Sequence, residues 1–589
     1  MLRSGRNDGY DGEMTDDTTT IPSVEDWQHW ALVMARANQL IMEAWADNLA
    51  KGKSMPGFGL PVAEKVADPM AWMSAGAEAW SKGLEAWSQM LGQYSQAAET
   101  RDRRFASPEW RENPIFDTVR QSYLAISEKL LGTVEEIEGL DEAARQRLRF
   151  ATKNFVDAMS PTNFMATNPE VMKRTIETKG ENLLAGLKNM LADISRGQVT
   201  QSPEGAFELG RNLAMTPGKV IYETRLFQLI QYAPTTEEVL QTPLVIFPPW
   251  INRFYILDLT PEKSFVKWCV EQGVTLFMVS WKSADESLRD ITMDDYIGAQ
   301  LEAIDVIRDA LGVKATHVIG YCVAGTTLAA TLAYLAASGE ADKVASATFF
   351  TAQVDFEDAG DLKMFVGDET LETLKQLTAE TGVLDGRVMA ATFNLLRGRD
   401  LIWNYVVNNY MMGNDPPPFD LLHWNSDVTN LPGEWHRDYL DRLYRQNLMM
   451  KPGGIEVKGV PIDLTKIATP AYIQAGREDH IAPAPSVWKL TRVLKGPKRF
   501  ILAGSGHIAG VVNPPAAGKY QYWTSDEPAS TLPEFIAYST EHKGSWWPDW
   551  ILWLKSLGAR TVKADGARIP GEGKLKAIED APGRYVRTR

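Results

Sequence analysis

Cys322 is the residue of this sequence whose setting best suits nucleophilic chemistry. It stands in THVIGYCVAGTTLAAT, Thr316–Thr331, between a short apolar run and an alanine-rich run that is typical of a helix. A strand, a sharp turn and a helix in this order are the context of a nucleophile elbow. The start of a helix also favours a thiolate, because the helix dipole places partial positive charge there. A buried cysteine at a helix start fits this stretch equally well, so the assignment needs further residues.

The residues around Cys322 are small, as an elbow requires. Strand and helix approach closely at such a turn, so very small residues are expected two positions before and two positions after the nucleophile. Gly320 fills the first position. Ala324 fills the second, where glycine is usual, and Gly325 follows it. We expect Ala324 to be a mild departure that alters the packing or the rate of the elbow and leaves the nucleophile in place.

Two later segments offer the acid and the base that a cysteine nucleophile needs. A thiol near its ordinary pKa is mostly protonated at neutral pH, so Cys322 requires a base. The apolar run PAYIQAG leads into REDHIAP and offers Asp479, and KRFILAG leads into SGHIAG and offers His507. Nucleophile, acid and histidine thus follow in order, each directly after a predicted strand. Because the carboxyl ends of parallel strands meet at one edge of a sheet, the sequence predicts a Cys322–Asp479–His507 triad.

Other residues compete for these roles. Glu478 is an alternative carboxylate to orient the histidine. His480 adjoins Asp479, but a neighbour in an extended loop points the other way, so we assign it to local structure. His317 lies inside the strand before Cys322, and we expect a packed core imidazole. Cys269 lies in FVKWCVEQG, which is typical of the packed face of a helix.

An acyl-transfer site also needs two backbone donors for a tetrahedral oxyanion. One is the N–H of the residue after the nucleophile, Val323. The other is expected from the loop after an earlier strand, and FPPWINRFY follows PLVI at a suitable place. Trp250 or Ile251 can supply that N–H, and we select Ile251 as the candidate.

Short apolar runs that alternate with helical patterns set the predicted fold class. Runs without polar alternation are typical of parallel strands that are covered on both faces. Helical patterns such as Met293–Gly312 lie between them, and this alternation predicts a doubly wound α/β sheet. The runs are Pro243–Trp250, Val274–Trp281, Thr316–Gly320, Ala345–Val354, Pro470–Gly476 and Lys498–Gly506.

The chain is long enough for several domains, and its composition changes along its length. Residues 1–23 are polar and acidic without a period, and we expect a disordered tail. Residues 24–200 have helical periodicity and predict a helical N-terminal domain. Residues 201–589 predict the α/β domain, and within it the alternation breaks at about 358–461, which indicates a cap over the carboxyl end of the sheet. The last 30 residues are polar, and we expect them to lie on the surface.

Composition excludes several classes of function. The net charge of −15 and the pI of about 5.2 argue against a nucleic-acid-binding protein. Two cysteines cannot form a disulfide framework, and the N-terminus has no signal-peptide pattern. No apolar run is long enough to span a bilayer. No zinc spacing, P-loop or dinucleotide fingerprint is present, so we expect a soluble cytoplasmic protein without a bound cofactor.

Tryptophans are numerous in the N-terminal region. Met73, Ala77, Trp80, Leu84, Trp87, Leu91 and Tyr94 follow one another at spacings of four and three, which places them on one stripe of a helix. Packing against neighbouring helices explains such a stripe. An amphipathic surface for a partner, a second copy or an apolar aggregate explains it as well.

Several motifs in this order make the chain resemble the class I poly(3-hydroxyalkanoate) synthases. The resemblance begins near residue 25 and extends to the end of the chain. It is strongest in NLAMTPGKVIYE, PPWINRFYILDL, GYCVAGT, FDLLHWNSDVTNLPG, GREDHIAP, GSGHIAGVVNPP and AIEDAPGRYV. The usual box of this family is G-x-C-x-G-G, from which this chain departs only at Ala324.

This resemblance implies a fold, an activity and a set of roles. The fold is an α/β-hydrolase fold with a cap insertion after a helical N-terminal domain. Cys322 is then the carrier of the growing polyester, His507 the base and Asp479 the third member, which acts directly or through His507. The substrate is an (R)-3-hydroxyacyl-CoA, typically 3-hydroxybutyryl-CoA. Trp424 matches a family tryptophan of the cap, near the site or a dimer contact, with simple cap packing as the alternative.

The resemblance also implies partners. The N-terminal domain of the family is linked to dimerisation, to the polymer granule and to phasin-type granule proteins, which gives the stripe at Met73–Tyr94 an apolar surface to bind. Two rival functions remain open. One is a cysteine esterase or intracellular polyester depolymerase with the same triad and water as acceptor. The other is a granule-surface protein without catalysis.

Overall fold

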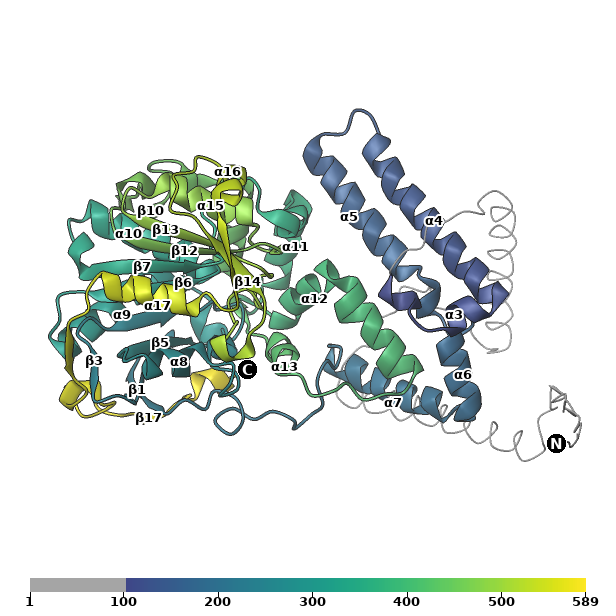
Figure 1. The fold of residues 1–589 in the computed structure, drawn as a ribbon, viewed down its shortest axis with the longest axis horizontal. Coiled ribbons are helices and arrows are strands. Elements are labelled where there is room, and N and C mark those ends of the chain that lie inside the picture. The colour runs from purple at the N-terminus through teal and green to yellow at the C-terminus, as the bar shows by residue number, and fades with distance from the viewer. Residues whose placement is uncertain (1–101) are drawn as a thin grey trace, which may run out of the picture. The chain divides into compact units, whose positions relative to one another are not determined.

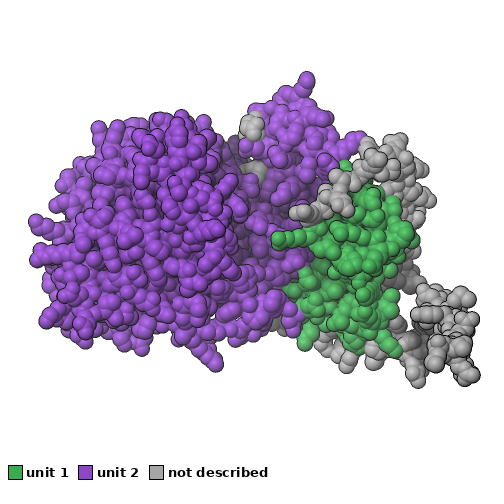
Figure 2. Space-filling view, in the orientation of Figure 1, with its two compact units in different colours: residues 1–126, 160–196, 406–414 green, residues 127–159, 197–405, 415–589 purple. Residues whose placement is uncertain are grey.

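The computed structural model describes residues 102–589, which fall into two compact units (Figure 2). The predicted tail, residues 1–23, and the stripe at Met73–Tyr94 lie outside the described residues. Within the described chain, one unit is made of residues 102–126, 160–196 and 406–414, and the other of residues 127–159, 197–405 and 415–589.

These units do not coincide with the domains predicted from the sequence. Residues 127–159 lie in the predicted helical domain of 24–200, but they belong to the unit that contains the sheet. Residues 406–414 lie in the predicted cap, but they belong to the helical unit. Helical periodicity shows which residues share a face, whereas the choice of neighbour depends on contacts between segments far apart in the chain.

The larger unit is built on an 11-stranded sheet in the order β15-β14-β13-β12-β7-β6-β4-β5-β2-β1-β17 (Figure 1). The central strands from β13 to β5 are parallel, and antiparallel strands extend both edges. The parallel strands are β4 (Leu244–Phe247), β5 (Leu276–Trp281), β6 (Thr316–Tyr321), β7 (Val344–Phe350), β12 (Ala471–Gly476) and β13 (Lys498–Ala503). Each of the six predicted runs therefore overlaps one of these strands, and β6 and β7 each extend one residue beyond their run.

The remaining strands lie at the edges of this sheet or in two-stranded pairs. The antiparallel edge strands are β1 (Gly218–Glu223), β2 (Phe227–Tyr232), β14 (Gln521–Thr524), β15 (Thr540–Lys543) and β17 (Glu579–Asp580). The two-stranded pairs are β3 (Glu238–Leu240) with β16 (Thr561–Lys563), β8 (Val383–Leu384) with β9 (Leu431–Pro432), and β10 (Glu456–Val457) with β11 (Val460–Pro461).

Helices cover both faces of the sheet and bury it in two apolar layers. One layer contains side chains of α9 (Met293–Leu311), α10 (Val323–Ala337), α15 (Ala484–Val493) and α16 (Leu532–Tyr538). The other contains side chains of α8 (Phe265–Glu271) and α17 (Trp547–Ser556). Cys269 is fully buried in α8, as predicted.

Local sequence explains the bounds of α9. Thr292 and Asp295 form a reciprocal capping box at its start, which satisfies backbone donors that have no partner inside the helix. Gly312 ends the helix with a φ of 64°, a left-handed conformation that glycine adopts without steric cost. The predicted helix Met293–Gly312 is therefore confirmed to within one residue.

A long helical insertion separates β7 from β12 and contains the predicted cap. Its helices are α11 (Asp368–Leu377), α12 (Gly386–Leu396), α13 (Asp420–Ser426) and α14 (Gly433–Asp438), with π-helical turns at Arg399–Trp403 and Tyr439–Arg445. Helix α5 (Glu142–Ala158) packs on this insertion in the same unit. Phe150 meets Phe365 edge to face at 5.4 Å, and Asp157 pairs with Arg399 at 2.9 Å.

The smaller unit is helical in its described part. It contains α3 (Glu109–Glu112), the first half of α4 (Pro114–Glu136), α6 (Pro169–Glu177), α7 (Glu181–Arg196) and the π-helical turn Val406–Met411. Gly186 of α7 lies against the backbone of Tyr410, where a Cβ atom would be only 1.9 Å from the carbonyl oxygen. The Tyr410 hydroxyl donates to Asp193 at 2.7 Å. These contacts hold residues 406–414 on α7.

The last 30 residues do more than lie on the surface. They contribute β16, which pairs with β3, and β17, which extends the main sheet beside β1. Arg568, which lies between β16 and β17 in the sequence, is buried and donates to the carbonyl oxygens of Leu240 and Gln241. The polar composition of this segment gives no sign that it pairs with two strands, because backbone pairing and one buried guanidinium hold it in place.

No helix among the described residues has the length and apolar character that crossing a bilayer would require.

Candidate active site

Cys322 lies at a strained turn between β6 and α10. Its backbone adopts φ 55° and ψ −126°, a region that residues other than glycine rarely occupy. Two hydrogen bonds hold this conformation: the Cys322 N–H donates to Phe350 O at 2.9 Å, and its carbonyl accepts from Gly325 N at 2.9 Å. Strain of this kind persists where the surroundings fix it, and it is frequent at active sites. The predicted elbow geometry is therefore present.

The close approach at this elbow is made by Gly320 and Gly325. A Cβ atom on Gly320 would lie 2.6 Å from the Cα of Gly325. A Cβ atom on Gly325 would lie 2.8 Å from the Gly320 carbonyl oxygen and 2.4 Å from the Cβ of Ala352. A small residue is therefore also needed at Gly325, three positions after Cys322 and directly after the predicted small position Ala324. The Ala324 side chain is fully buried in the core on α10, and its carbonyl oxygen would lie 3.0 Å from a Cβ atom on Gly320.

Asp479 and His507 meet at the carboxyl ends of β12 and β13. His507 Nδ1 lies 2.7 Å from Asp479 Oδ2, and both side chains are buried. The other carboxylate oxygen, Oδ1, accepts the N–H groups of Ile481 and Ala482 at 2.8 and 2.9 Å. The carboxylate is thus fully engaged and holds the imidazole with Nδ1 protonated, which leaves Nε2 for Cys322.

Charges around His507 oppose the effect of its burial. Burial alone would lower the pKa of His507, because it disfavours the charged form. The charges of Asp479 and Cys322, and hydrogen bonds with both, raise that pKa well above its ordinary value. The imidazole is therefore able to take a proton from Cys322 and to keep it during a reaction.

The competing residues have other environments. Glu478 is exposed, whereas Asp479 beside it is buried against His507. His317 is buried inside β6, where Nδ1 lies 2.7 Å from the Ser346 hydroxyl, so it is a core imidazole as predicted. His480 differs from the expectation of purely local structure, because it lines a cavity that also contains Cys322 and His507.

The backbone N–H groups of Val323 and Ile251 have no acceptor among the described residues, as oxyanion donors require. Val323 is the first residue of α10, and none of the described residues accepts a hydrogen bond from its N–H. Within residues 102–589 the N–H of Ile251 also has no acceptor. Ile251 lines the space around Cys322, whereas the Trp250 indole is buried and stacks on Tyr296 with 3.9 Å between ring centroids. Ile251 is thus the better candidate of the two.

Two cavities in the larger unit meet at Cys322 and Ile251. The first has a volume of about 180 Å³ and an apolar wall that includes Phe365, Leu374 and Leu440 of the insertion. The second has a volume of about 470 Å³, and its wall carries many polar side chains. These are Asn252, Arg397, Asp400, Asn425, Glu478, His480 and His507. The nucleophile therefore faces one apolar and one polar space.

Trp424 belongs to the wall of the larger cavity. Its indole is buried, and Nε1 donates to the carbonyl oxygen of Arg253 at 2.7 Å. The side chain therefore combines cap packing with a place beside the nucleophile. The neighbouring residues Arg253, Asp427 and Thr429 are not among the predicted site residues, although the motifs PPWINRFYILDL and FDLLHWNSDVTNLPG contain them.

Comparison with known proteins identifies the family. Residues 101–269 match the family model of the poly-beta-hydroxybutyrate polymerase (PhaC) N-terminus, and residues 243–514 match the α/β hydrolase fold. The poly(3-hydroxyalkanoate) polymerase subunit PhaC of Rhizobium meliloti (strain 1021) is 41% identical, with 96% of each chain covered. The chain belongs to the poly(3-hydroxyalkanoate) polymerase family. The predicted family and the predicted α/β-hydrolase fold are confirmed.

Further relatives in this polymerase family extend the likeness over most of the chain. The polymerase subunit PhaC of Cupriavidus necator is 47% identical, with 83% of each chain covered. The poly(3-hydroxyalkanoate) polymerase of Methylorubrum extorquens is 46% identical, covering 83% of this chain and 81% of its own. This chain is therefore an acyltransferase of the polymerase family, with Cys322, Asp479 and His507 as its candidate catalytic residues.

Proposed function

We propose that this polymerase joins (R)-3-hydroxyacyl units from CoA thioesters into a polyester that is carried as a thioester on Cys322. The observation that supports this most strongly is the His507–Asp479 hydrogen bond of 2.7 Å next to a cysteine on a strained elbow. A class I preference and 3-hydroxybutyryl-CoA as the natural substrate are part of the proposal. The reaction needs no cofactor beyond the CoA of the substrate.

The first step is acylation of Cys322. His507 Nε2 accepts the thiol proton, and Sγ attacks the carbonyl carbon of the substrate thioester. The carbonyl oxygen becomes an oxyanion, to which the N–H groups of Val323 and Ile251 donate. The bond from carbon to the CoA sulfur then breaks, and His507 returns the proton to the leaving thiolate. Both bonds are thioesters, so the exchange has little energetic cost.

Elongation uses the same groups. The 3-hydroxyl of an acyl unit gives its proton to His507, and its oxygen attacks the carbonyl carbon of a second thioester. An oxygen ester forms, the bond from the carbonyl carbon to sulfur breaks, and His507 returns its proton to the leaving thiolate. Asp479 acts through His507 in this scheme, because its two carboxylate oxygens are already engaged by the imidazole and by two backbone N–H groups.

The two cavities support separate places for the substrate and the product. A CoA moiety is polar, which suits the larger cavity with the polar side chains on its wall, where Arg397 pairs with Asp400 at 2.7 Å. A polyester chain has alternating methylene and ester groups, which suits the apolar cavity of the insertion. Cys322 lies where the two meet, so an acyl group on its sulfur can face either space.

The test is CoA release from 3-hydroxybutyryl-CoA by the purified protein, measured beside polymer formation. Cys322→Ala lowers turnover at least about 10³-fold, because the nucleophile is lost. Cys322→Ser lowers it at least about 10²-fold, because an oxygen ester on the enzyme passes its acyl group to a hydroxyl less readily than a thioester. Cys269→Ala removes the buried thiol of α8 and serves as the matched control with retained turnover.

Near-normal turnover in Cys322→Ser would contradict the thioester mechanism. Soluble hydroxy acids formed without any dependence on CoA would instead identify a cysteine esterase or depolymerase. Full activity in Cys322→Ala would support a granule protein whose fold does not use this site.

We also propose that the enzyme acts in the cytoplasm on the surface of polymer granules, as a homodimer and with phasin-type partners. The support for this comes from the sequence of the N-terminal region, whose stripe at Met73–Tyr94 carries two tryptophans on one face of an expected helix.

A further inference from the structure

Thr429 of the insertion contacts the backbone that carries the oxyanion donor. Its side chain is buried, and Oγ1 lies 2.7 Å from the carbonyl oxygens of both Trp250 and Ile251, which share its single proton. The Trp250 carbonyl and the Ile251 N–H belong to the same peptide group. A trans peptide is planar, so its C=O and N–H point in opposite directions. A hydroxyl that holds the Trp250 carbonyl therefore also sets the direction of the Ile251 N–H.

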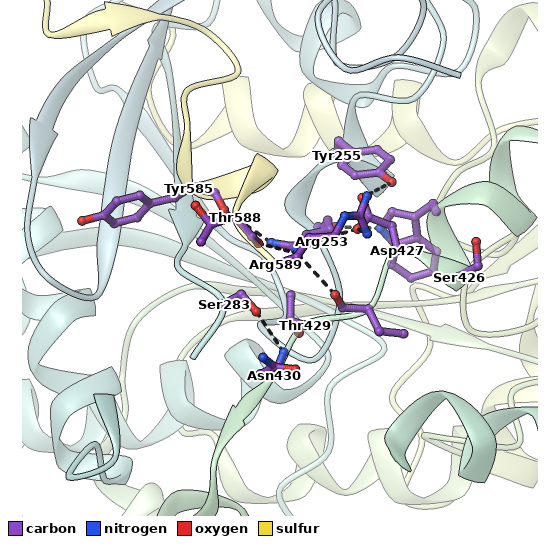
Figure 3. Close-up of polar contacts among 12 residues, drawn as sticks. Arg253, Tyr255, Ser283, Ser426, Asp427, Thr429, Asn430, Tyr585, Thr588 and Arg589 are labelled. Carbon is purple, nitrogen blue, oxygen red and sulfur yellow. Dashed lines mark hydrogen bonds and ion pairs between the residues drawn. The ribbon is translucent and has the colours of Figure 1, made fainter. Parts of the chain in front are cut away.

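The segment around Thr429 runs along this loop and adds further contacts. Asn252 and Val428 form an antiparallel bridge. Asn430, on the other side of Thr429, donates its N–H to the Ser283 hydroxyl at 3.0 Å (Figure 3). The Thr429 hydroxyl is thus fixed by backbone contacts on both sides.

A buried ion pair contacts the segment that carries Thr429, because Arg253 donates to the carbonyl oxygen of Val428 at 3.3 Å. Arg253 and Asp427 are almost fully buried and pair at 3.3 Å, and the Tyr255 hydroxyl donates to Asp427 at 2.8 Å (Figure 3). Burial lowers the pKa of Arg253, which the charge of Asp427 opposes. Such a pair is costly to bury, and removal of either partner would leave the other charge buried and unpaired.

The C-terminal tail completes this network. The Arg253 guanidinium donates to the carbonyl oxygens of Tyr585 and Thr588 at 3.3 and 2.7 Å (Figure 3). The side chain of Arg589, the last residue, donates to Asp427 at 2.6 Å. The tail therefore contacts Arg253, which lies two residues after Ile251, and Asp427, which lies two residues before Thr429.

We propose that Thr429 is a positioning residue for acyl transfer, which directs the Ile251 N–H at the developing oxyanion and is itself held by the Arg253–Asp427 pair and the C-terminal tail. This role rests on the proposed acylation of Cys322. It explains why the insertion and the end of the chain converge on one loop beside the nucleophile.

The test replaces the Thr429 hydroxyl while keeping its shape. Thr429→Val removes the shared hydrogen bond to both carbonyls, and the expected result is a fall of kcat of about tenfold or more with an unchanged KM, because a misdirected donor weakens stabilisation of the transition state alone. Thr429→Ser keeps the hydroxyl and restores kcat to within about threefold. Thr465→Val, an exposed threonine whose hydroxyl bonds Asp463, is the matched control.

Two additional measurements separate positioning from general damage. Alkylation of Cys322 by iodoacetamide needs the thiolate but no oxyanion donor, so its rate stays unchanged in Thr429→Val. Arg589→Ala changes a mostly exposed side chain and lowers kcat by about threefold, again with normal alkylation. A wild-type kcat in Thr429→Val, or an equal loss of acyl transfer and alkylation, overturns the proposal.

Acylation is measured with 3-hydroxybutyryl-CoA and with p-nitrophenyl butyrate, an activated ester that needs the same oxyanion. If the wild-type protein reacts with the ester and makes no polymer, the proposed function fails, and the ester still tests Thr429. If neither donor acylates Cys322, both proposals fail.

Discussion

His317 and His507 are both buried histidines, yet their surroundings shift their pKa values in opposite directions. Burial lowers the pKa of His317 to about 4, and its Nδ1 lies against the neutral Ser346 hydroxyl. The charges of Asp479 and Cys322 outweigh burial at His507 and raise its pKa. The neighbouring charges therefore separate a packing residue from a proton carrier.

The lowered pKa of His317 predicts a loss of stability in acid. Its folded pKa of about 4 lies below the ordinary value of 6.5, so below pH 6.5 the unfolded chain binds a proton that the folded chain does not. The stability that His317 contributes is present above pH 6.5 and is lost as pH falls toward 4. The whole effect is about 3 kcal/mol, and about 2 kcal/mol of it falls between pH 7 and pH 5.

Urea unfolding of His317→Gln tests this expectation. The variant should lose about 2 kcal/mol less than the wild type between pH 7 and pH 5, whatever its stability at pH 7. His542→Gln alters a partly exposed histidine of β15 and should follow the wild type. Parallel pH profiles of His317→Gln and the wild type would show that His317 is not the source of acid sensitivity.

The catalytic candidates could be predicted at the residue scale, but the residues that support them could not. Cys322, Asp479 and His507 each follow a strand, and the order of strands in the sequence indicates where their ends meet. Thr429 lies 178 residues after Ile251, and nothing local links the two. Its role depends on how the insertion folds back onto the loop, which no periodicity or motif spacing specifies.

At the scale of elements, the turn from β6 to α10 shows where small residues are required. Gly320 and Gly325 touch across the turn, whereas Ala324 lies in the apolar layer of α10. The sequence indicated the need for small residues on both sides of Cys322, and the structure adds Gly325 as a position where even a methyl group does not fit. The pitch of the helix decides which side chain faces the strand, and this depends on where the first turn begins.

This geometry predicts unequal effects of two substitutions one residue apart. Gly325→Ala places a methyl group against Ala352 and the Gly320 carbonyl, so we expect a loss of about 2 kcal/mol in unfolding free energy and at least a tenfold loss of kcat as Cys322 is displaced. Ala324→Gly costs about 1 kcal/mol through helix propensity and keeps kcat within about twofold. Denaturant unfolding and CoA release measure both quantities, and a larger kcat effect at Ala324 would refute the assignment.

At the scale of the whole molecule, the sheet could be predicted and its edges could not. The six central strands are apolar and rich in β-branched and aromatic residues, so the sequence itself predicts that they are buried. Strands β16 and β17 are two or three residues long and polar, and they are held by backbone pairing and by Arg568. Interactions of this kind leave no hydropathy signal. The exchange of residues 406–414 between the predicted cap and the helical unit is hidden for the same reason.

The proposed attachment to a granule gives the last prediction at this scale. Trp80 and Trp87 lie seven residues apart on the stripe Met73–Tyr94, and each indole can bury roughly 150–250 Å² against an apolar surface. The double variant Trp80→Ser/Trp87→Ser should reduce the fraction of protein that sediments with polymer granules at least about tenfold, because several kcal/mol of apolar burial are lost. Turnover with soluble 3-hydroxybutyryl-CoA should stay within about twofold.

Lys82→Ser/Glu85→Ser changes two residues off the stripe and is the control. Unchanged sedimentation of the tryptophan variant would exclude the stripe as the attachment surface, and a shift in molar mass by light scattering would assign it to the dimer contact.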